Sequence, residues 1–272
     1  MKGKINIFSL FLYKCCELLK DGGVLSYVLP INFLTMKVYN DLRTYIDKNF
    51  QILRIKICDD ENLFKETKQV TCIFTMRKQK NIDNTQFIFR IKNNIIFMDD
   101  LETKTIYDHY DTFSSRQEIN ISTGRIVWNQ IKNKITDAKT NNTSLLIYDF
   151  NIVDNKVVID LEKQNKTKKQ YVLDNCDKKF KPPFILVERG RGQQMKKFRH
   201  VLVEDNFENE DGYLIENHLY VITGPLLLLK KINSRFSEKS FLKVCENYLK
   251  TGSMTKGLLE TLPIFKKINP ET

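Results

Sequence analysis

Residues 17–34 read ELLKDGGVLSYVLPINFL, and this stretch decides what kind of fold the N-terminal part of the chain adopts. Upstream of it, residues 5–19 carry apolar side chains at helical spacing and predict a helix with a buried face. Residues 21–23 end this helix because glycine accommodates the conformations of a helix terminus. Residues 24–29 are mostly apolar and predict a buried strand, which Pro30 ends. A helix therefore feeds directly into a strand.

Further elements follow at short intervals. Asn32 is predicted to cap a helix that runs to about residue 49. A loop is expected at residues 58–68. Strands are predicted at residues 52–57, 70–76 and 87–91. The order of helix, strand, helix, strand, loop and strand is typical of half of a layered α/β sheet.

The pattern changes after a polar stretch at residues 93–122, and we place a domain boundary between residues 105 and 106. Short strands then alternate with charged loops, and two helices at residues 226–236 and 240–249 close the chain. This second part, residues 106–272, is predicted to be α+β. Its strands are expected at residues 144–148, 156–160, 184–187, 213–215 and 219–222.

Charge and cysteine usage limit the classes of function. The 44 lysines and arginines exceed the 33 acidic residues, which gives a formal charge of +11 and favours an acidic partner such as nucleic acid. A compositional bias of the genome is the alternative explanation. No membrane span or secretory signal is expected, so we predict an intracellular, cytoplasmic protein. The six cysteines form no Cys-x-x-Cys pair, and we expect reduced thiols and no metal site.

Several short motifs follow one another along the first 80 residues, and their order is informative. The chain carries NIFSLF at 6–11, ELLKDGG at 17–23, VLSYVLP at 24–30, NFL at 32–34, LRTYI at 42–46, NLF at 62–64 and VTCIF at 70–74. This ordered set resembles the second half of the catalytic domain of adenine-N6-specific DNA methyltransferases. The resemblance implies a partial Rossmann-like sheet, and S-adenosyl-L-methionine as the cofactor.

The second part of the chain resembles the target-recognition domains of the same family more loosely. The matching pieces are STGRIVWN at 122–129, ILVERGRG at 185–192, ENH at 216–218, TGSMTK at 251–256 and LPI at 262–264. The resemblance implies that double-stranded DNA is the partner of this domain.

Two family motifs are missing from the 272 residues: the glycine-containing cofactor loop and the catalytic Asn-Pro-Pro-Tyr/Phe tetrapeptide, which in this family lie upstream. The resemblance therefore implies the C-terminal part of such an enzyme, as a fragment or as a subunit that pairs with an N-terminal half. It also implies an exposed first helix and an open sheet edge. Residues 181–184, KPPF, lack the asparagine and are interpreted as a loop before a strand. Whether the chain alone is an enzyme stays open.

The resemblance assigns roles to four aromatic or polar residues of the first part. Phe64 matches the position that packs against an adenine flipped out of the duplex. The alternative is that Phe64 anchors its loop to the core. Asn6, Phe8 and Phe11 match positions that contribute to the slot for the cofactor's adenine. The alternative is that the two phenylalanines are core residues of an amphipathic helix, and this alternative suits Phe11 better than Phe8.

The densest candidate for DNA contact is the segment 188–199, because it combines glycines with arginine and glutamine side chains that can pair with phosphates and base edges. A solvated charged turn is the alternative. Its candidate residues are Arg189, Arg191, Gln193, Gln194, Lys196, Lys197 and Arg199.

Three smaller groups extend this predicted interface. Asn217 and His218 follow a short strand, and a structural hydrogen bond is an equally good explanation for them. Ser253 and Thr255 are typical of a phosphate contact near a helix start, although a plain helix cap explains the same residues. The third group comprises Arg125 and Lys132 beside Trp128, which is itself more typical of a core residue.

Three functions from different classes remain. The leading one is a site-specific DNA adenine-N6 methyltransferase of restriction–modification type, present as its C-terminal part. The alternative is a non-catalytic, sequence-specific DNA-binding module of a restriction–modification system. The third is a structural or interaction protein that is basic only through compositional bias, and it predicts no salt-dependent affinity for DNA.

Overall fold

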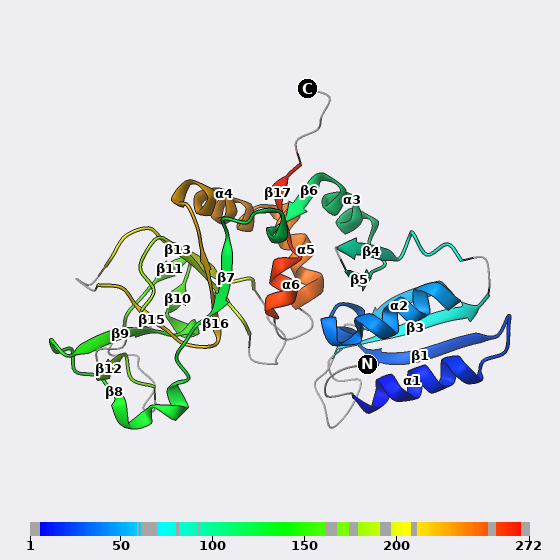
Figure 1. Cartoon of the computed structure of the whole chain (residues 1–272), viewed down its shortest axis with the longest axis horizontal. Coiled ribbons are helices and arrows are strands. Elements are labelled where there is room, and N and C mark those ends of the chain that lie inside the picture. Colours follow the sequence, from blue (N-terminus) through cyan, green and yellow to red (C-terminus); the bar gives the residue numbers. More distant parts are fainter. Residues whose placement is uncertain are drawn as a thin grey trace. The chain divides into compact units, whose positions relative to one another are not determined.

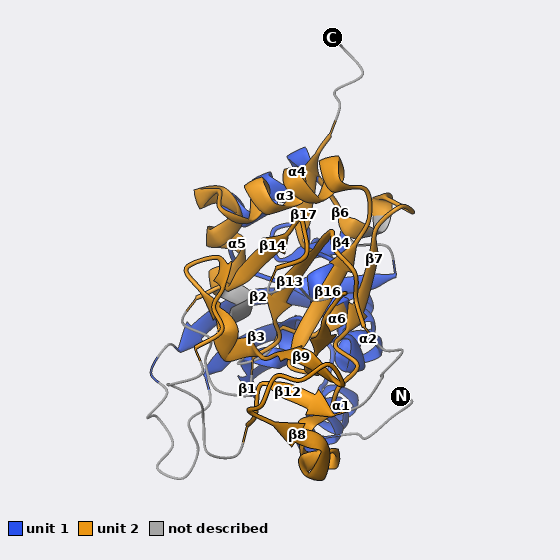
Figure 2. Ribbon diagram, turned by 90° about the vertical axis from the view of Figure 1, so that its left-hand side faces the viewer, with its two compact units in different colours: residues 1–110, 257–261 blue, residues 111–256, 262–272 orange. Residues whose placement is uncertain are grey.

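The computed structural model describes residues 6–58, 60, 70–79, 82–91, 93–160, 168–173, 179–190, 197–207, 211–249 and 254–267. Its contacts divide the chain into two compact units (Figure 1 and Figure 2). Unit 1 comprises Met1–Tyr110 and Gly257–Thr261, and unit 2 comprises Asp111–Lys256 and Leu262–Thr272. The assignment of residues 1–105 to catalysis and 106–272 to target recognition stays a prediction.

Unit 1 is built around a three-stranded sheet with the order β1-β3-β2. Both outer strands, β1 (Val24–Pro30) and β2 (Phe50–Cys58), run antiparallel to the central strand β3 (Thr71–Lys78). Pro30 and Cys58 both pair with Thr71, so the two outer strands are parallel to each other and end at the same edge of the sheet. All three strands were predicted from the apolar runs.

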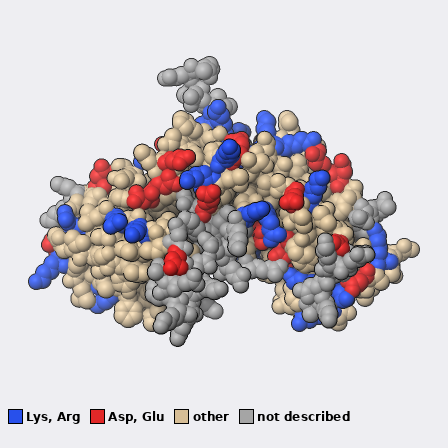
Figure 3. Space-filling model, turned by 180° about the vertical axis from the view of Figure 1, so that it is seen from behind, with Lys and Arg blue, Asp and Glu red and all other residues tan. Residues whose placement is uncertain are grey.

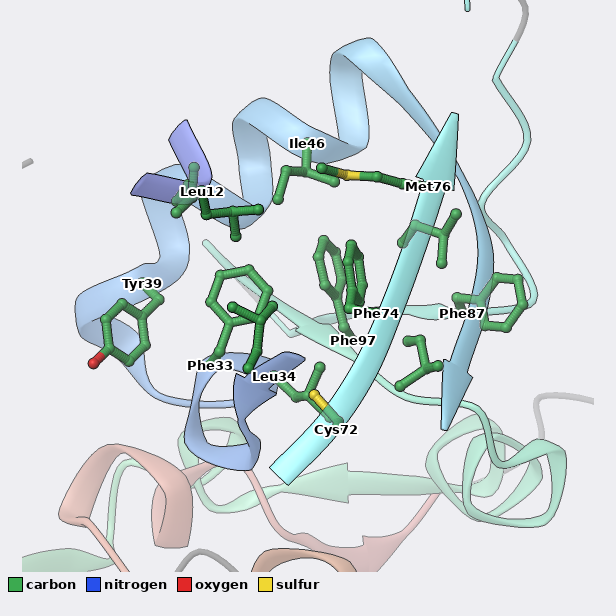
Figure 4. Close-up of a cluster of buried hydrophobic side chains, with 14 of the residues drawn as sticks. Leu12, Phe33, Leu34, Tyr39, Ile46, Cys72, Phe74, Met76, Phe87 and Phe97 are labelled. Carbon is green, nitrogen blue, oxygen red and sulfur yellow. The ribbon is translucent and has the colours of Figure 1, made fainter. Parts of the chain in front are cut away.

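The core of unit 1 lies on one face of this sheet. Helices α1 (Ile7–Leu18) and α2 (Asn40–Asn49) contribute to the same buried cluster as the hairpin of β4 (Ile88–Ile91) and β5 (Asn94–Phe97). Figure 4 shows the aromatic centre of the cluster, where the rings of Phe74 and Phe97 stack with centroids 5.5 Å apart.

The helix predicted to start at Asn32 starts eight residues later, at Asn40. Two short 3-10 turns, η1 (Ile31–Leu34) and η2 (Lys37–Tyr39), occupy the intervening residues. The fully buried Arg43 explains the difference, since its guanidinium donates hydrogen bonds to the carbonyls of Phe33 at 2.6 Å and Met36 at 2.9 Å. These hydrogen bonds stabilise the two 3-10 turns in place of a continuous α-helix.

Unit 2 contains two four-stranded sheets with one shared core. The first has the order β15-β9-β12-β8, and the second has the order β14-β13-β16-β7. Leu145 and Ile147 of the first sheet pack in the same buried cluster as Leu186, Val201 and Val221 of the second. The strands are β7 (Asn120–Thr123), β8 (Ile135–Thr136), β9 (Thr143–Ile147), β12 (Tyr171–Leu173), β13 (Phe184–Glu188), β14 (His200–Val203), β15 (Leu214–Ile215) and β16 (Leu219–Thr223).

Two helices cover the opposite face of the second sheet. Side chains alternate along a strand, so His200 of β14 points away from Val201 and contacts the ring of Phe236, at a centroid distance of 5.1 Å. Phe236 ends α4 (Leu226–Phe236), which packs against β13 and β14, and α5 (Lys239–Leu249) contacts α4. The sequence predicted the bounds of α4 and those of α5 to within one residue.

The remaining elements are short. The polar stretch at residues 93–122 contains β5, α3 (Leu101–His109), β6 (Tyr110–Thr112), η3 (Phe113–Ser115) and β7. Asp100 explains the start of α3, because its carboxylate accepts hydrogen bonds from the N–H groups of Glu102 and Thr103. The others are η4 (Trp128–Gln130), η5 (Lys132–Lys134), η6 (Asp149–Asn151), the hairpin of β10 (Ile152–Val153) and β11 (Lys156–Val157), α6 (Lys256–Glu260), and β17 (Pro263–Lys266), which pairs with β6.

The fold is thus mixed α/β with several small sheets, and a Rossmann-like sheet and a recognition domain stay predictions. Among the described residues, no helix combines the length and apolarity that crossing a membrane requires. Cys16, Cys72 and Cys245 are buried free thiols, and burial raises the pKa of Cys16 and Cys72 to about 12. Such buried thiols are poor nucleophiles near neutral pH.

Candidate nucleic-acid interface

Four of the sequence pieces predicted to contact DNA converge in unit 2. The backbone N–H of Asn217 donates to the carbonyl of Ile126 at 2.9 Å, and the N–H of Arg189 donates to the carbonyl of His218 at 2.8 Å. The N–H of Met254 in turn donates to the carbonyl of Arg189 at 2.8 Å. We call residues 124–126, 188–190, 216–218 and Met254 the loop cluster. Segments up to 130 residues apart in sequence are therefore joined by backbone hydrogen bonds.

The loop between β13 and β14 is closed at its base by Glu188 and Arg199. Nε and Nη2 of Arg199 donate to the two carboxylate oxygens of Glu188 at 2.6 and 2.7 Å, and the N–H of Glu188 donates to the carbonyl of Arg199 at 3.0 Å. This carboxylate raises the pKa of Arg199 above its ordinary value. A bidentate pair of this kind occupies the face of the guanidinium that would bind a phosphate. Arg199 therefore holds the loop, whereas Arg189 at its start is exposed.

Gly124 lets two chain segments approach each other closely. Its N–H donates to the carbonyl of Leu219 at 2.8 Å, and a Cβ at this position would lie 2.1 Å from the backbone oxygen of Glu216. Any larger residue would separate the segments. The next residue, Arg125, is exposed, and its guanidinium lies over the ring of Phe180 at 4.3 Å from the centroid. This stacking holds the cation in place at the edge of the loop cluster.

Glu216 and His218 form a hydrogen-bonded pair. His218 Nδ1 lies 2.7 Å from Oε1 and 3.0 Å from Oε2 of Glu216, and the N–H of His218 donates to Oε2 at 2.9 Å. Sequence analysis named Asn217 and His218 but missed the role of Glu216. The available signal was an acidic residue two positions before a histidine in a short turn.

Lys132 lies beside a cluster of aromatic rings. Its Nζ is 5.4 Å from the centroid of Trp128, and Nζ of Lys168 lies 5.5 Å from Trp128 and 4.9 Å from Tyr148. Trp128 is half-buried against the small core that includes Tyr148 and Phe150. Lys132 itself is exposed. Sequence analysis did not find Lys168, because its partners come from separate segments.

The other predicted DNA contacts divide into two groups. Lys197 is exposed and Thr255 is half-buried. Residues outside the described part of the chain are Phe64, Arg191, Gln193, Gln194, Lys196 and Ser253. Figure 3 shows basic and acidic side chains interspersed on one face of the molecule, so the excess positive charge alone does not mark the interface there.

Of the three predicted cofactor residues, Asn6 precedes α1, and the two phenylalanines lie on different faces of the helix. Asn6 hydrogen-bonds the side chain of Tyr39, and the ring of Phe8 packs on the Tyr39 ring at 5.1 Å between centroids. Phe11, in contrast, is 59% exposed, so the expectation that Phe11 rather than Phe8 is the core residue is wrong. Their contribution to a cofactor site stays a prediction.

Unit 1 leaves apolar surface uncovered beside an open sheet edge. Among the described strands, β1 pairs with β3 alone. Val24 and Val28 of β1 are 49% and 52% exposed. Four residues of α1 are 48–72% exposed, and their spacing places them on one stripe of the helix. They are Ile7, Leu10, Phe11 and Leu18. Large apolar patches of this kind mark interaction surfaces.

Comparison with known proteins shows which proteins this chain is similar to. Residues 1–64 match the sequence model of the Eco57I restriction-modification methylase family. The chain is 25% identical over 269 residues to the Type II methyltransferase M.CvrRI of Paramecium bursaria Chlorella virus XZ-6E. This alignment covers 97% of this chain and 66% of the relative. The chain is 27% identical over 147 residues to the Type II methyltransferase M.AccI of Acinetobacter calcoaceticus, which covers 52% of this chain and 26% of that relative.

A solved structure shares the fold. The Type IIL restriction-modification enzyme MmeI, determined in complex with DNA, matches 94% of this chain and 41% of its own with a TM-score of 0.52 at 10% identity. The resemblance to type II restriction–modification methyltransferases that the sequence motifs predicted is confirmed. The chain spans 66% or less of the length of the relatives named above, and 41% of the MmeI chain.

Proposed function

We propose that this chain is the C-terminal part of an S-adenosyl-L-methionine-dependent DNA adenine-N6 methyltransferase, in which unit 2 recognises duplex DNA. The convergence of the loop cluster carries this proposal. Separate segments bring Arg125, Arg189 and His218 to one part of unit 2, and arginine and histidine side chains suit phosphates and base edges. The structural neighbour MmeI was solved with DNA, which supports the same role.

Binding of the full chain to duplex oligonucleotides at two salt concentrations tests the DNA-binding role. Loss of two phosphate contacts in the Arg125→Ala/Arg189→Ala variant is expected to lower affinity and to reduce the slope of log K against log salt by about 2. The Lys239→Ala/Lys243→Ala variant removes the same charge from exposed positions of α5 and is the matched control. Equal effects of both double variants would show that affinity for DNA depends on net charge and not on the position of the arginines in the loop cluster.

We propose further that β1 and the exposed stripe of α1 receive the methyltransferase half that carries the cofactor loop and the Asn-Pro-Pro-Tyr/Phe tetrapeptide. This half is polypeptide outside the 272 residues, either on a longer chain or as a separate subunit. The greater length of the relatives supports it, as does the outer edge of β1, which none of the described strands pairs with and where another strand can add.

Co-expression with such an N-terminal half tests this arrangement through methylation of adenine in genomic DNA. Phe11→Glu with Leu18→Lys is expected to abolish copurification and methylation, because charges would replace apolar contacts on the stripe. Leu227→Lys, at an apolar residue of α4 that is 70% exposed, is the control and should change neither. Copurification that survives the stripe variant would exclude α1 as the interface. DNA binding without any methylation would favour a non-catalytic recognition module.

A further inference from the structure

The pair of Glu216 and His218 can offer a hydrogen-bond acceptor, whereas the arginine side chains of the loop cluster can only donate. The side chain of Glu216 is 0% exposed, whereas 35% of the side chain of His218 is exposed. The carboxylate bonds both Nδ1 and the backbone N–H of His218. Only the imidazole of the pair is therefore open to a ligand, and the buried carboxylate of Glu216 fixes the orientation of the ring.

The carboxylate decides which imidazole nitrogen carries the proton. An ionised carboxylate accepts hydrogen bonds and donates none, so Nδ1 of His218 must donate to Glu216. In the neutral imidazole, the proton is then on Nδ1 and Nε2 is an acceptor. Within the described part of the chain, no hydrogen bond uses Nε2 of His218.

We propose that His218 reads one base of the recognised site through Nε2 as a hydrogen-bond acceptor, and that Glu216 is the positioning residue that sets this polarity. In the major groove, the donors are the exocyclic amines of adenine and cytosine, whereas guanine and thymine present acceptors at the same edge. His218 therefore selects adenine or cytosine at one position of the strand that it contacts. This inference rests on the proposed function of unit 2 as the DNA-recognition unit.

The described segments around His218 carry ionisable groups of their own. Arg189 donates its backbone N–H to the carbonyl of His218, and Arg125 lies on the segment that pairs with residues 216 and 217. Tyr148 lies within electrostatic range of Glu216.

Selection of bound duplexes from a randomised library by the full chain tests the proposal. At pH 8, the wild-type chain is expected to select adenine or cytosine at one position, and His218→Ala to lose that preference by roughly fivefold or more, the effect of one mismatched base pair. Glu216→Gln is expected to select guanine or thymine there, because its amide donates to Nδ1 and moves the ring proton to Nε2. His109→Gln, at the exposed end of α3, is the control.

The outcomes separate this inference from the proposed function. If the wild-type chain binds duplexes selectively but keeps the same preferences in both variants, His218 is not a base reader although unit 2 still recognises DNA. A uniform loss of affinity across all sequences would assign His218 to a phosphate and would also overturn the inference. Absence of any duplex binding by the wild-type chain would overturn the proposed function itself. If Glu216→Gln does not fold by circular dichroism, the comparison of the wild-type chain with His218→Ala decides.

Discussion

The sheet of unit 1 is covered on one face and open along β1, whereas the two sheets of unit 2 share a core and each buries side chains on both of its faces. Unit 1 consequently exposes valines of β1 and an apolar stripe of α1. In unit 2, the shared core is flanked by helix α4 on one side and by the smaller cluster around Leu146 on the other.

This difference indicates how the two units depend on other molecules. Burial of apolar area is the main stabilising contribution to a fold, and unit 1 leaves part of its apolar surface in water. We infer that unit 1 gains stability from an added strand and helix. Unit 2 buries apolar side chains on both faces of its two sheets, and it presents polar loops that are suited to a ligand. Four substitutions test this comparison.

Arg43→Met is expected to have the largest effect, and to act on unit 1. It removes donors from the carbonyls of Phe33, Met36 and Ile95, which are left unsatisfied in the core. The expected loss in free energy of unfolding is about 3–5 kcal/mol, measured by denaturant titration. Arg199→Met breaks the partly exposed pair with Glu188 and should cost less. Equal losses of unfolding free energy for both variants would show that the buried Arg43 stabilises the fold no more than the partly exposed Arg199 does.

Gly124→Ala is expected to destabilise unit 2 by about 2–4 kcal/mol, because the new methyl group meets the backbone of Glu216 and forces two segments apart. Thermal unfolding measures this loss. Gly257→Ala is the control, because nothing lies within 4 Å of its Cβ position and alanine favours the helix α6. A Gly124 variant as stable as the Gly257 variant would show that the loop cluster is loosely packed.

His200 is expected to make unit 2 sensitive to acid. Burial lowers its pKa from 6.5 to about 4, so the unfolded chain binds more protons between these values and stability falls as the pH falls through this window. The loss approaches about 3 kcal/mol near pH 4. His200→Leu should flatten the dependence of unfolding free energy on pH from 7 to 4, whereas His218→Gln should leave most of it. An unchanged profile in the leucine variant would assign the acid sensitivity to other groups.

Gly22→Ala is expected to have the smallest effect, on unit 1. Gly22 has φ +76° at the turn between α1 and β1, and an alanine there costs about 1 kcal/mol of backbone strain although nothing lies within 4 Å of the new methyl group. Differential scanning calorimetry detects a change of this size. No change in the melting temperature would show that this turn readjusts freely.

The sequence predicts strands and helices well where apolar residues are continuous or periodic. The run at residues 24–29 predicted β1, and residues 226–236 predicted α4. The start of α2 was mispredicted, because Arg43 reads as an exposed helical residue in sequence but binds carbonyls from three other segments. A buried arginine of this kind is decided by tertiary packing, which local propensity does not contain.

The candidate site follows the same division. The glycine and arginine motifs at residues 124–125 and 189–190 are visible in the sequence, and backbone hydrogen bonds in unit 2 place both of them in the loop cluster. The ion pair of Arg199 with Glu188 and the pairing of Glu216 with His218 depend on side-chain geometry. Sequence alone therefore named Arg199 and His218 as contacts without separating the residue that holds the loop from the one that faces outward.

Amide hydrogen exchange of the full chain tests most directly the claim that unit 2 takes DNA while unit 1 takes a methyltransferase half. Adding a selected duplex is expected to protect amides of the loop cluster and to leave β1 unchanged, whereas adding the N-terminal half should protect β1 and α1. A duplex that protects β1 and spares the loop cluster would contradict the account. So would a free chain in which the outward-facing amides of β1 exchange as slowly as those of the central strand β3.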